Sequence, residues 1–353
     1  MSQQKAILTN DIAQELSRSL QKKTYDNVFI LTDENTQNSC YPILNKHNAL
    51  DNAIPIVIAA SDNNKNIDTL TTVWKALSEN GGSRQSLLIN LGGGMVTDLG
   101  GFAASTFKRG INYYNIPTTL LAMVDASMGG KTGINFLGLK NEIGVFNPPA
   151  EVWIHTPFLK TLDRENILSG YAEMLKHGLI STEQHWNSLL AFDLDRLDYS
   201  LLQQLIGESI QTKENIVAQD PFEKSIRKAL NLGHTIGHAF ESLALKENRA
   251  ILHGYAVAWG LVCEIYLSHI QLQFPQNKLQ QLLYFIKNNY GGFRFTCHDY
   301  ETLYELMLHD KKNKGGIINF TLLKDIGEIE INQTTNKNRI FECFDFYRDA
   351  MGI

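Results

Sequence analysis

The sequence predicts an α/β domain with a Rossmann-like, mostly parallel sheet, followed by a mainly α-helical domain. At 353 residues the chain exceeds the length at which a single hydrophobic core stops growing, and 43% of its residues are hydrophobic. Apolar runs alternate with helical patterns up to about Thr156, and helical periodicity dominates beyond it. We therefore expect one domain over residues 1–155 and a second over residues 156–353.

The first domain contains short apolar runs separated by turn residues and helical patterns. The expected strands are residues 27–32, 54–60, 86–91, 113–116 and, after Pro148 and Pro149, residues 152–156. A helical pattern at residues 70–79 lies between two of them. Because strands that alternate with helices pair in parallel, these runs predict a doubly wound sheet.

The second domain contains helical patterns over most of its length. They cover residues 163–179, 201–218, 227–245, 255–270, 279–288 and 300–308. Residues 315–331 carry two short β-like runs, which we expect to close the domain. The last twenty residues give no prediction.

The composition predicts a small-molecule partner and a cytoplasmic location. A net charge of −5, without a run of lysine or arginine, argues against nucleic acid and against an anionic membrane surface. The N-terminal segment lacks the apolar core of a signal peptide, and no apolar run is long enough to suggest a membrane span. The 4 cysteines are far apart in sequence, so we interpret them as reduced packing residues.

A glycine-rich stretch predicts a site for an anionic group. Gly92–Gly94 follow an apolar run, so a buried strand would open into a turn whose bare backbone amides can hold phosphate. The dinucleotide-binding fingerprint is only half matched, because Thr97 stands at its third glycine. A second pair, Gly129 and Gly130, precedes Lys131, which adds a cation to the predicted site.

Histidines at helical spacing suggest a metal site in the second domain. His234 and His238 are four residues apart and share a helix face, and His253 begins the next helical pattern. Thr235 occupies the place of the glutamate in the metalloprotease motif, so peptide hydrolysis is not supported. Spacing alone leaves open whether these histidines are ligands or structural residues.

Several motifs resemble those of the 3-dehydroquinate synthase family, within the sugar phosphate cyclases. They are GGGMVTDLGGF, FKRG, IPTTLLAMVDASMGGKTGIN and KNEIGVF, and the similarity extends from about Asn27 to about Ile329. The resemblance implies a homodimeric lyase of the shikimate pathway of chorismate and aromatic amino acid biosynthesis, dependent on NAD and on zinc or cobalt. Its reaction converts 3-deoxy-D-arabino-heptulosonate 7-phosphate to 3-dehydroquinate and phosphate. In the family NAD⁺ first oxidises a hydroxyl, phosphate then leaves by elimination, and NADH reduces the ketone back.

The resemblance also implies roles for individual residues. The metal ligands are Glu173, His234 and His253. Contacts to the substrate phosphate come from Arg109, Lys131, Asn141, Asn231 and His238, contacts near its carboxylate from Lys213 and Arg227, and Lys176 is a further active-site lysine. Lys311 or Lys312 is expected in the same region. The cofactor residues are Asp33, Asn35, Asp62, Lys65, Gly93, Gly94, Asp98, Thr118, Thr119, Asp125, Lys131 and Lys140.

The sequence departs from the family pattern in three places and leaves three alternatives open. Asp62 stands where the family usually has glutamate and Thr97 where it usually has glycine, which leaves the NAD affinity open, and the LGLKN spelling around Leu139 is the third departure. A cyclase acting on a sugar phosphate without a carboxylate would have no use for Lys213 and Arg227. A polyol dehydrogenase of similar fold needs no phosphate-binding cations. An NAD-binding protein without catalysis is expected to have lost some of these residues.

Overall fold

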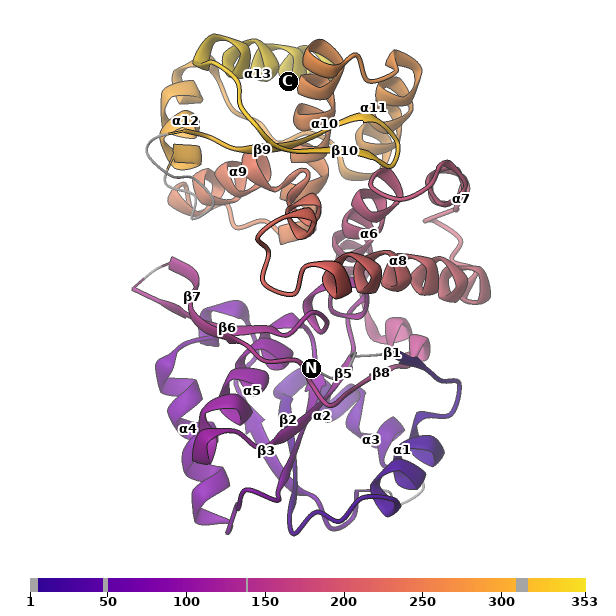
Figure 1. Cartoon of the computed structure of the whole chain (residues 1–353), viewed down its shortest axis with the longest axis vertical. Helices are drawn as coiled ribbons and strands as arrows, with labels where there is room; N and C mark the ends of the chain where they lie inside the picture. The colour runs from indigo at the N-terminus through magenta and orange to yellow at the C-terminus, as the bar shows by residue number, and fades with distance from the viewer. Residues whose placement is uncertain (1–5, 47–49, 138, 309–316) are drawn as a thin grey trace. The chain divides into compact units, whose positions relative to one another are not determined.

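The computed structural model describes residues 6–46, 50–137, 139–308 and 317–353 (Figure 1). The chain forms two compact units, Met1–Asp163 and Arg164–Ile353. The division falls after the short 3₁₀ helix Thr156–Thr161, slightly later than the boundary expected near Thr156.

The first unit is built on a six-stranded sheet in which every strand pair is parallel, in the order β1-β8-β5-β4-β2-β3. The strands are β1 (Ala6–Leu8), β2 (Val28–Asp33), β3 (Ile54–Ile58), β4 (Leu87–Gly92), β5 (Asn112–Pro117) and β8 (Glu151–Ile154). All residues of β4 are buried, as expected for a central parallel strand covered on both faces. The predicted doubly wound sheet is therefore confirmed, with β1 as an additional edge strand.

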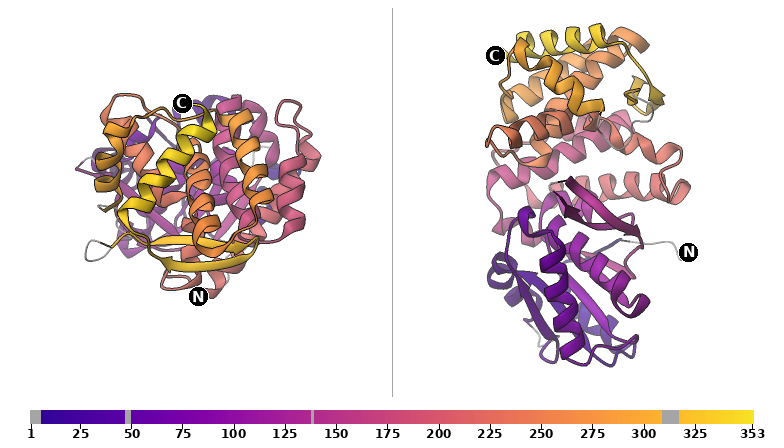
Figure 2. Two further views of the ribbon diagram at one scale, coloured as in Figure 1. Left: turned by 90° about the horizontal axis from the view of Figure 1, so that it is seen from above. Right: turned by 90° about the vertical axis from the view of Figure 1, so that its left-hand side faces the viewer.

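The helices of the first unit pack around this sheet (Figure 2). They are α1 (Ile12–Gln21), α2 (Glu34–Ser39), α3 (Tyr41–Leu44), α4 (Ile67–Glu79) and α5 (Gly94–Thr106), with short turns at Asp62–Asn64, Phe107–Arg109 and Ala122–Ala126. One core joins α4 and α5 to the sheet, for example through Leu70, Leu99 and Leu88. The helix expected at residues 70–79 is thus present and begins three residues earlier, where Asn66 caps it.

The strand order places a ligand-binding edge at β2 and β4. β3 lies on one side of β2 and β4 on the other, so the chain reverses direction across the sheet between β3 and β4. In open α/β sheets the crevice at the carboxyl ends of strands flanking such a reversal is the usual ligand site. Asp33 ends β2 and Gly92 ends β4, so the predicted cofactor residues begin at this edge.

An antiparallel hairpin, β6 (Lys131–Phe136) and β7 (Leu139–Phe146), is an element that the sequence analysis did not predict. All eight residues of β7 are exposed in the chain, so no buried face produces the alternating pattern by which such a strand is recognised. The hairpin carries Lys131, Lys140 and Asn141, three of the predicted site residues.

The second unit is mainly helical and is arranged around α10 (Figure 1). Its helices are α6 (Arg164–Leu179), α7 (Glu183–Ala191), α8 (Tyr199–Gln219), α9 (His234–Lys246), α10 (His253–Leu272), α11 (Gln276–Tyr290), α12 (Tyr300–Leu308) and α13 (Lys337–Met351). α10 contacts α6, α9, α11 and α13, as well as the antiparallel hairpin β9 (Phe320–Asp325) and β10 (Glu328–Gln333). The predicted helical domain and the two short β runs near its end are confirmed.

The single helix expected over residues 227–245 is wrong. A 3₁₀ segment covers Ile226–Asn231, and α9 begins separately at His234. The break occurs at Gly233, whose φ of +80° is a left-handed conformation that helix interiors exclude. Gly233 is therefore the N-cap of α9 and does not lie in mid-helix.

The segment without a prediction forms α13, which completes the core of the second unit. Cys343, Phe344 and Tyr347 are buried, and the Phe344 and Tyr347 rings pack against Phe240 of α9. Cys40, Cys263 and Cys343 are buried free thiols, whereas Cys297 is exposed, so the interpretation as packing residues fails for Cys297. Among the described residues no helix is both long and apolar enough to cross a membrane.

Candidate active site

The centre of the candidate site in the second unit is the carboxylate of Glu173. Its side chain lies on α6 and is completely buried. Its Oε1 lies 3.3 Å from Nε2 of His234 and 3.4 Å from Nε2 of His253. The structure thus brings together the three residues that the resemblance implies as metal ligands.

His234 and His253 reach this position because each is the first residue of its helix. His234 begins α9 and His253 begins α10. The helices come close because glycines lie where they meet: a Cβ on Gly254 would lie 1.8 Å from the carbonyl oxygen of Ser169 on α6. A side chain at residue 254 would therefore separate α10 from the helix that carries Glu173.

The charges of this cluster are set by burial and by mutual contact. Burial alone would raise the pKa of Glu173, but Lys176, with which it forms an ion pair, and His234 hold that pKa well below its usual value. Burial lowers the pKa of His234 to about 4, against the attraction of Glu173. Burial would also lower the pKa of His253, but hydrogen bonds to Glu173 and Glu241 raise it to about 10. The cluster without metal therefore holds an anionic Glu173, a neutral His234 and a protonated His253.

His238 offers a further nitrogen to the same cluster. One ring nitrogen from each of His234, His238 and His253 lies within 4.8 Å of the others, a separation that a single ion can bridge. The His238 and His253 ring centroids are 5.8 Å apart. The residue expected near the substrate is therefore adjacent to the expected ligands.

Glu241 is a residue of this site that sequence analysis missed. Its Oε2 lies 3.3 Å from Nδ1 of His253, while Nε2 of the same ring faces Glu173. A carboxylate on the far nitrogen of a ligand histidine fixes the orientation and tautomer of the ring. Its spacing in the sequence could have indicated it, because Glu241 lies three residues after His238 and shares its helix face.

In the first unit, the glycine turn and the next strand end form one edge of the sheet. Gly93 is the N-cap of α5 and supplies no side chain, so the first amides of the helix have no cap from it. A Cβ on Gly93 would lie 3.1 Å from Cγ2 of Thr119, and the amide of Thr118 donates to the carbonyl of Gly92. Asp33 caps α2 at the end of β2 by accepting from the amide of Thr36.

A second group in the first unit surrounds the ammonium of Lys65, which is buried. Nζ of Lys65 lies 3.0 Å from Oδ2 of Asp98, 2.6 Å from Oδ1 of Asn141 and 3.7 Å from Oδ1 of Asp62. Lys140 approaches the other oxygen of Asp62 at 3.6 Å. Burial alone would lower the pKa of Lys65, but Asp98 and Asp62 raise it, so the ammonium stays charged. Asn141, expected at the substrate phosphate, lies here among the expected cofactor residues.

Other predicted residues of the first unit lie on several different elements. Arg109 is exposed at the end of a 3₁₀ turn with φ +70°, and Lys131 is exposed at the start of β6. Asn35 is exposed in α2, and Asp125 is partly buried in the turn after Thr119. Lys311 and Lys312 lie outside the described residues.

The expected carboxylate-binding residues of the second unit are buried. Lys213 lies on α8 and Arg227 in the 3₁₀ segment that contacts α8, and both side chains are buried. Nη1 of Arg227 donates to the carbonyl of Pro221, and Nδ2 of Asn231 donates to Oε1 of Glu223 at 2.7 Å. Glu223 was not predicted from the sequence.

The loop that holds Arg227 is itself organised by Asp220. Its carboxylate accepts from the backbone amides of Lys224, Ser225 and Arg227 at 3.0, 2.6 and 3.1 Å. Burial opposes the effect, but these hydrogen bonds lower the pKa of Asp220 to about 2.

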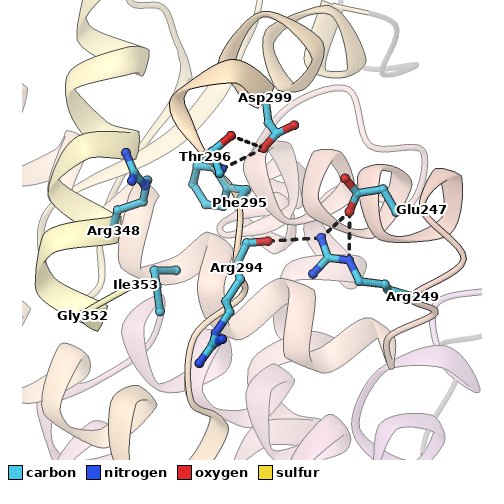
Figure 3. A pocket seen from close by; sticks show the side chains of 9 residues that line it. All are labelled: Glu247, Arg249, Arg294, Phe295, Thr296, Asp299, Arg348, Gly352 and Ile353. Carbon is cyan, nitrogen blue, oxygen red and sulfur yellow. Dashed lines mark hydrogen bonds and ion pairs between the residues drawn. The ribbon is translucent and has the colours of Figure 1, made fainter.

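A hollow of about 680 Å³ in the second unit is separate from these groups (Figure 3). It is lined by Arg249, Arg294 and Arg348 together with Glu247 and Asp299. Arg249 is bound to Glu247, and Asp299 caps a 3₁₀ turn through Thr296. None of the predicted site residues lines this hollow.

Comparison with known proteins identifies the family of the chain. Family models described as 3-dehydroquinate synthase N-terminal and C-terminal match residues 55–169 and 170–313. A 3-dehydroquinate synthase of Parabacteroides distasonis is 57% identical over 353 residues, covering 100% of both chains. One from Oceanobacillus iheyensis is 40% identical over 314 residues, covering 88% of this chain and 86% of the relative.

Among solved structures, 2-epi-5-epi-valiolone synthase of Streptomyces hygroscopicus, with NAD⁺ and Zn²⁺ bound, superimposes with a TM-score of 0.88 at 22% identity. The match covers 99% of this chain and 98% of that chain. The chain therefore has the same fold as that synthase. More narrowly, the family models and the relatives show that this chain belongs to the 3-dehydroquinate synthase family.

Proposed function

We propose that the chain catalyses conversion of 3-deoxy-D-arabino-heptulosonate 7-phosphate to 3-dehydroquinate and phosphate, as a cytoplasmic homodimeric lyase of the shikimate pathway. The observation that carries the proposal is the meeting of Glu173, His234 and His253 in a member of the 3-dehydroquinate synthase family. The relative with 57% identity over the whole chain is named 3-dehydroquinate synthase, which supports this reaction for the chain.

The donor set fits a divalent metal such as Zn²⁺ or Co²⁺. Two imidazoles and one carboxylate are a known catalytic zinc ligand set with an open position. Glu173 is anionic without metal, and its Oε1 faces both histidines at 3.3 and 3.4 Å. A bound metal would polarise a substrate oxygen as a Lewis acid.

The cofactor residues of the first unit fit NAD⁺. The bare amides after Gly93 suit the pyrophosphate, and Asp33 at the end of β2 suits a ribose hydroxyl. Lys65 is already held by Asp98 and Asn141, so we assign it to shaping the site as well as to contact with the cofactor. NAD⁺ would accept a hydride from the substrate and return it later in the reaction.

The cations of the chain bind and orient the substrate. We assign its carboxylate to Lys213 and Arg227, because a guanidinium can hold a carboxylate through two parallel hydrogen bonds and the lysine adds a point charge. We assign its phosphate to Lys131, Arg109, Asn231 and His238. Asn141 is assigned to the same phosphate, and Lys176 is assigned as a further active-site lysine. Holding the phosphate in place lets its own oxygens take the proton that is lost with elimination, a positioning contribution.

Phosphate release from three sugars tests this function. The heptulosonate phosphate should react, whereas glucose 6-phosphate and sedoheptulose 7-phosphate, which lack the carboxylate, should react more than tenfold more slowly, because the contacts of the carboxylate with Lys213 and Arg227 are missing, a loss of about 2 to 5 kcal/mol. Arg227→Ala should lower kcat/KM for the acid, and Arg227→Lys, which keeps the charge, should lower it less. Comparable turnover of a sugar without the carboxylate would favour another cyclase.

A further inference from the structure

A buried carboxylate from α10 binds the start of α9. Glu264 is completely buried, and it is the one acidic residue in the helix His253–Leu272. Its Oε2 accepts from the amide of Gly233 at 2.7 Å, and its Oε1 accepts from the amide of Ile236 at 3.0 Å. These two amides flank His234 in the sequence, so the carboxylate spans the turn that carries this histidine.

This contact replaces a cap that α9 cannot supply from its own sequence. The N-cap residue of a helix usually offers a side-chain oxygen to the amide of the third helical residue. In α9 that amide belongs to Ile236, and the N-cap is Gly233, which has no side chain. Glu264 supplies the missing acceptor from a neighbouring helix, and its negative charge lies at the positive end of α9.

Close packing explains why the N-cap is glycine. A Cβ on Gly233 would lie 2.8 Å from Cγ of Leu261, and a Cβ on Gly260 would lie 1.9 Å from the carbonyl oxygen of Gly233. The two helices therefore cross with backbone against backbone, and a capping side chain on residue 233 has no room. Such an approach leaves the carboxylate of Glu264, one turn further along α10, within reach of the turn.

We propose that Glu264 is a positioning residue for the metal site: by fixing Gly233 and Ile236 it holds His234 where its ring can meet Glu173 and His253. His234 depends on this turn for its ring orientation too, since its Nδ1 lies 3.1 Å from the carbonyl oxygen of Leu232. Both oxygens of the Glu264 carboxylate bind backbone amides of this turn, so Glu264 acts on His234 through the backbone. The inference rests on the proposed metal site.

Substitutions of Glu264 separate charge from shape. Glu264→Gln keeps the volume but turns one acceptor into a donor that faces a backbone N–H, and it removes the charge. Glu264→Asp keeps the charge but is one methylene shorter, so it cannot reach both amides. Ser268→Ala is the matched control. The Ser268 hydroxyl is a buried polar group of α10 that accepts from the amide of Leu323 in β9 and donates to the backbone carbonyl of Glu264, so its loss leaves the Glu264 carboxylate and its contacts with α9 in place.

The experiment measures affinity for Zn²⁺ by competition with a chromophoric chelator, together with the absorption spectrum of the Co²⁺-loaded protein. We expect the two Glu264 variants to bind Zn²⁺ about 10- to 100-fold more weakly, as for other residues that support metal ligands, and to show an altered Co²⁺ spectrum. Ser268→Ala should lower the thermal unfolding temperature while leaving both metal readouts unchanged. Circular dichroism establishes that each variant is folded.

The outcomes distinguish this inference from the proposed function. If the natural chain binds no metal, the proposed metal site fails and the inference fails with it. If the natural chain binds Zn²⁺ and folded Glu264→Gln binds it equally well with the same Co²⁺ spectrum, only the positioning role is overturned. If neither variant folds, hydrogen exchange in the natural chain decides: metal should slow exchange at Gly233 and Ile236, and unchanged exchange there would overturn the role.

Discussion

Glu241 Oε2 lies 3.3 Å from Nδ1 of His253, on the side of the imidazole opposite Glu173. The ring is thus held from both sides by carboxylates. On the proposed function, Glu173 and Nε2 of His253 would share the metal, and Glu241 would keep the ring turned toward it. This pairing is the arrangement in which a ligand histidine has its tautomer fixed by a neighbour.

Replacing Glu241 should therefore weaken metal binding without abolishing it. We expect Glu241→Gln to lower Zn²⁺ affinity by about 10- to 100-fold, because the far nitrogen of His253 loses its carboxylate partner. His253→Ala should lose both metal and turnover. Elemental analysis after dialysis and chelator competition measure the two effects.

The control for these variants is His298→Ala, since His298 is an exposed histidine of the same unit on a separate 3₁₀ turn. It should retain metal and activity. A purified His253→Ala protein that kept its metal and its activity would show that the ligand assignment is wrong.

Lys65 should contribute both to stability and to cofactor binding. Lys65→Met leaves Asp98 without its buried ammonium partner, and removing one member of a buried pair costs about 3 kcal/mol. We also expect a higher KM for NAD⁺. Urea unfolding and initial rates measure these effects. Lys140 is the control, because its side chain is 48% exposed and pairs with Asp62 at the surface. Lys140→Met should lower the free energy of unfolding by less than about 1 kcal/mol. Equal losses in the two variants would contradict the role given to Lys65.

The contribution of Asp220 should depend on pH in one direction. Its pKa in the folded chain, about 2, lies below the usual 3.8, so its stabilisation is complete above the usual value and is lost as pH falls toward 2. Asp220→Asn should lower the free energy of unfolding by about 2 kcal/mol at pH 7, since hydrogen bonds to a charged acceptor are lost. The difference in free energy of unfolding between Asp220→Asn and the natural chain should stay constant from pH 7 to 5 and become smaller below pH 5. A difference that persisted at pH 2 would contradict this account.

Arg109 should serve the partner chain in the proposed homodimer. Its side chain is exposed and forms no hydrogen bond or ion pair with the other described residues. If Arg109 of one chain reaches the substrate phosphate of the other, Arg109→Ala and Glu173→Ala chains are each inactive alone, and mixed dimers regain one working site. The measurement is activity after mixing and refolding, with each variant refolded alone as the control. No recovery in verified mixed dimers would assign Arg109 to its own chain or to the structure only.

The sequence predicted the elements that carry a continuous apolar run or a helical period. β2, β4 and α10 are such elements, because their burial imposes the pattern. The hairpin β6–β7 was not predicted, since all of β7 is exposed and nothing in its surroundings selects an alternating sequence. The start of α9 was misplaced because helical periodicity continues through Gly233, whereas its left-handed backbone depends on packing against α10.

The sequence indicated candidate site residues but not their contacts. Residue type and motif nominated Glu173, His234 and His253, and the structure brings them together. Sequence could not indicate that Asn141 bonds Lys65, because the two belong to a hairpin and a turn 76 residues apart. The role of Glu264 could not be predicted for a similar reason. Its partners are backbone amides of another helix, and these are present whatever the residue type.

The central claim is that oxidation by NAD⁺ is temporary and ends in loss of phosphate. It is tested most directly by following the nicotinamide absorbance and phosphate release together during turnover of the heptulosonate phosphate by the metal-loaded chain. We predict that phosphate accumulates over many turnovers, that omission of NAD⁺ stops the reaction, and that no NADH builds up. A rise in NADH in step with product would contradict the account and identify a dehydrogenase instead.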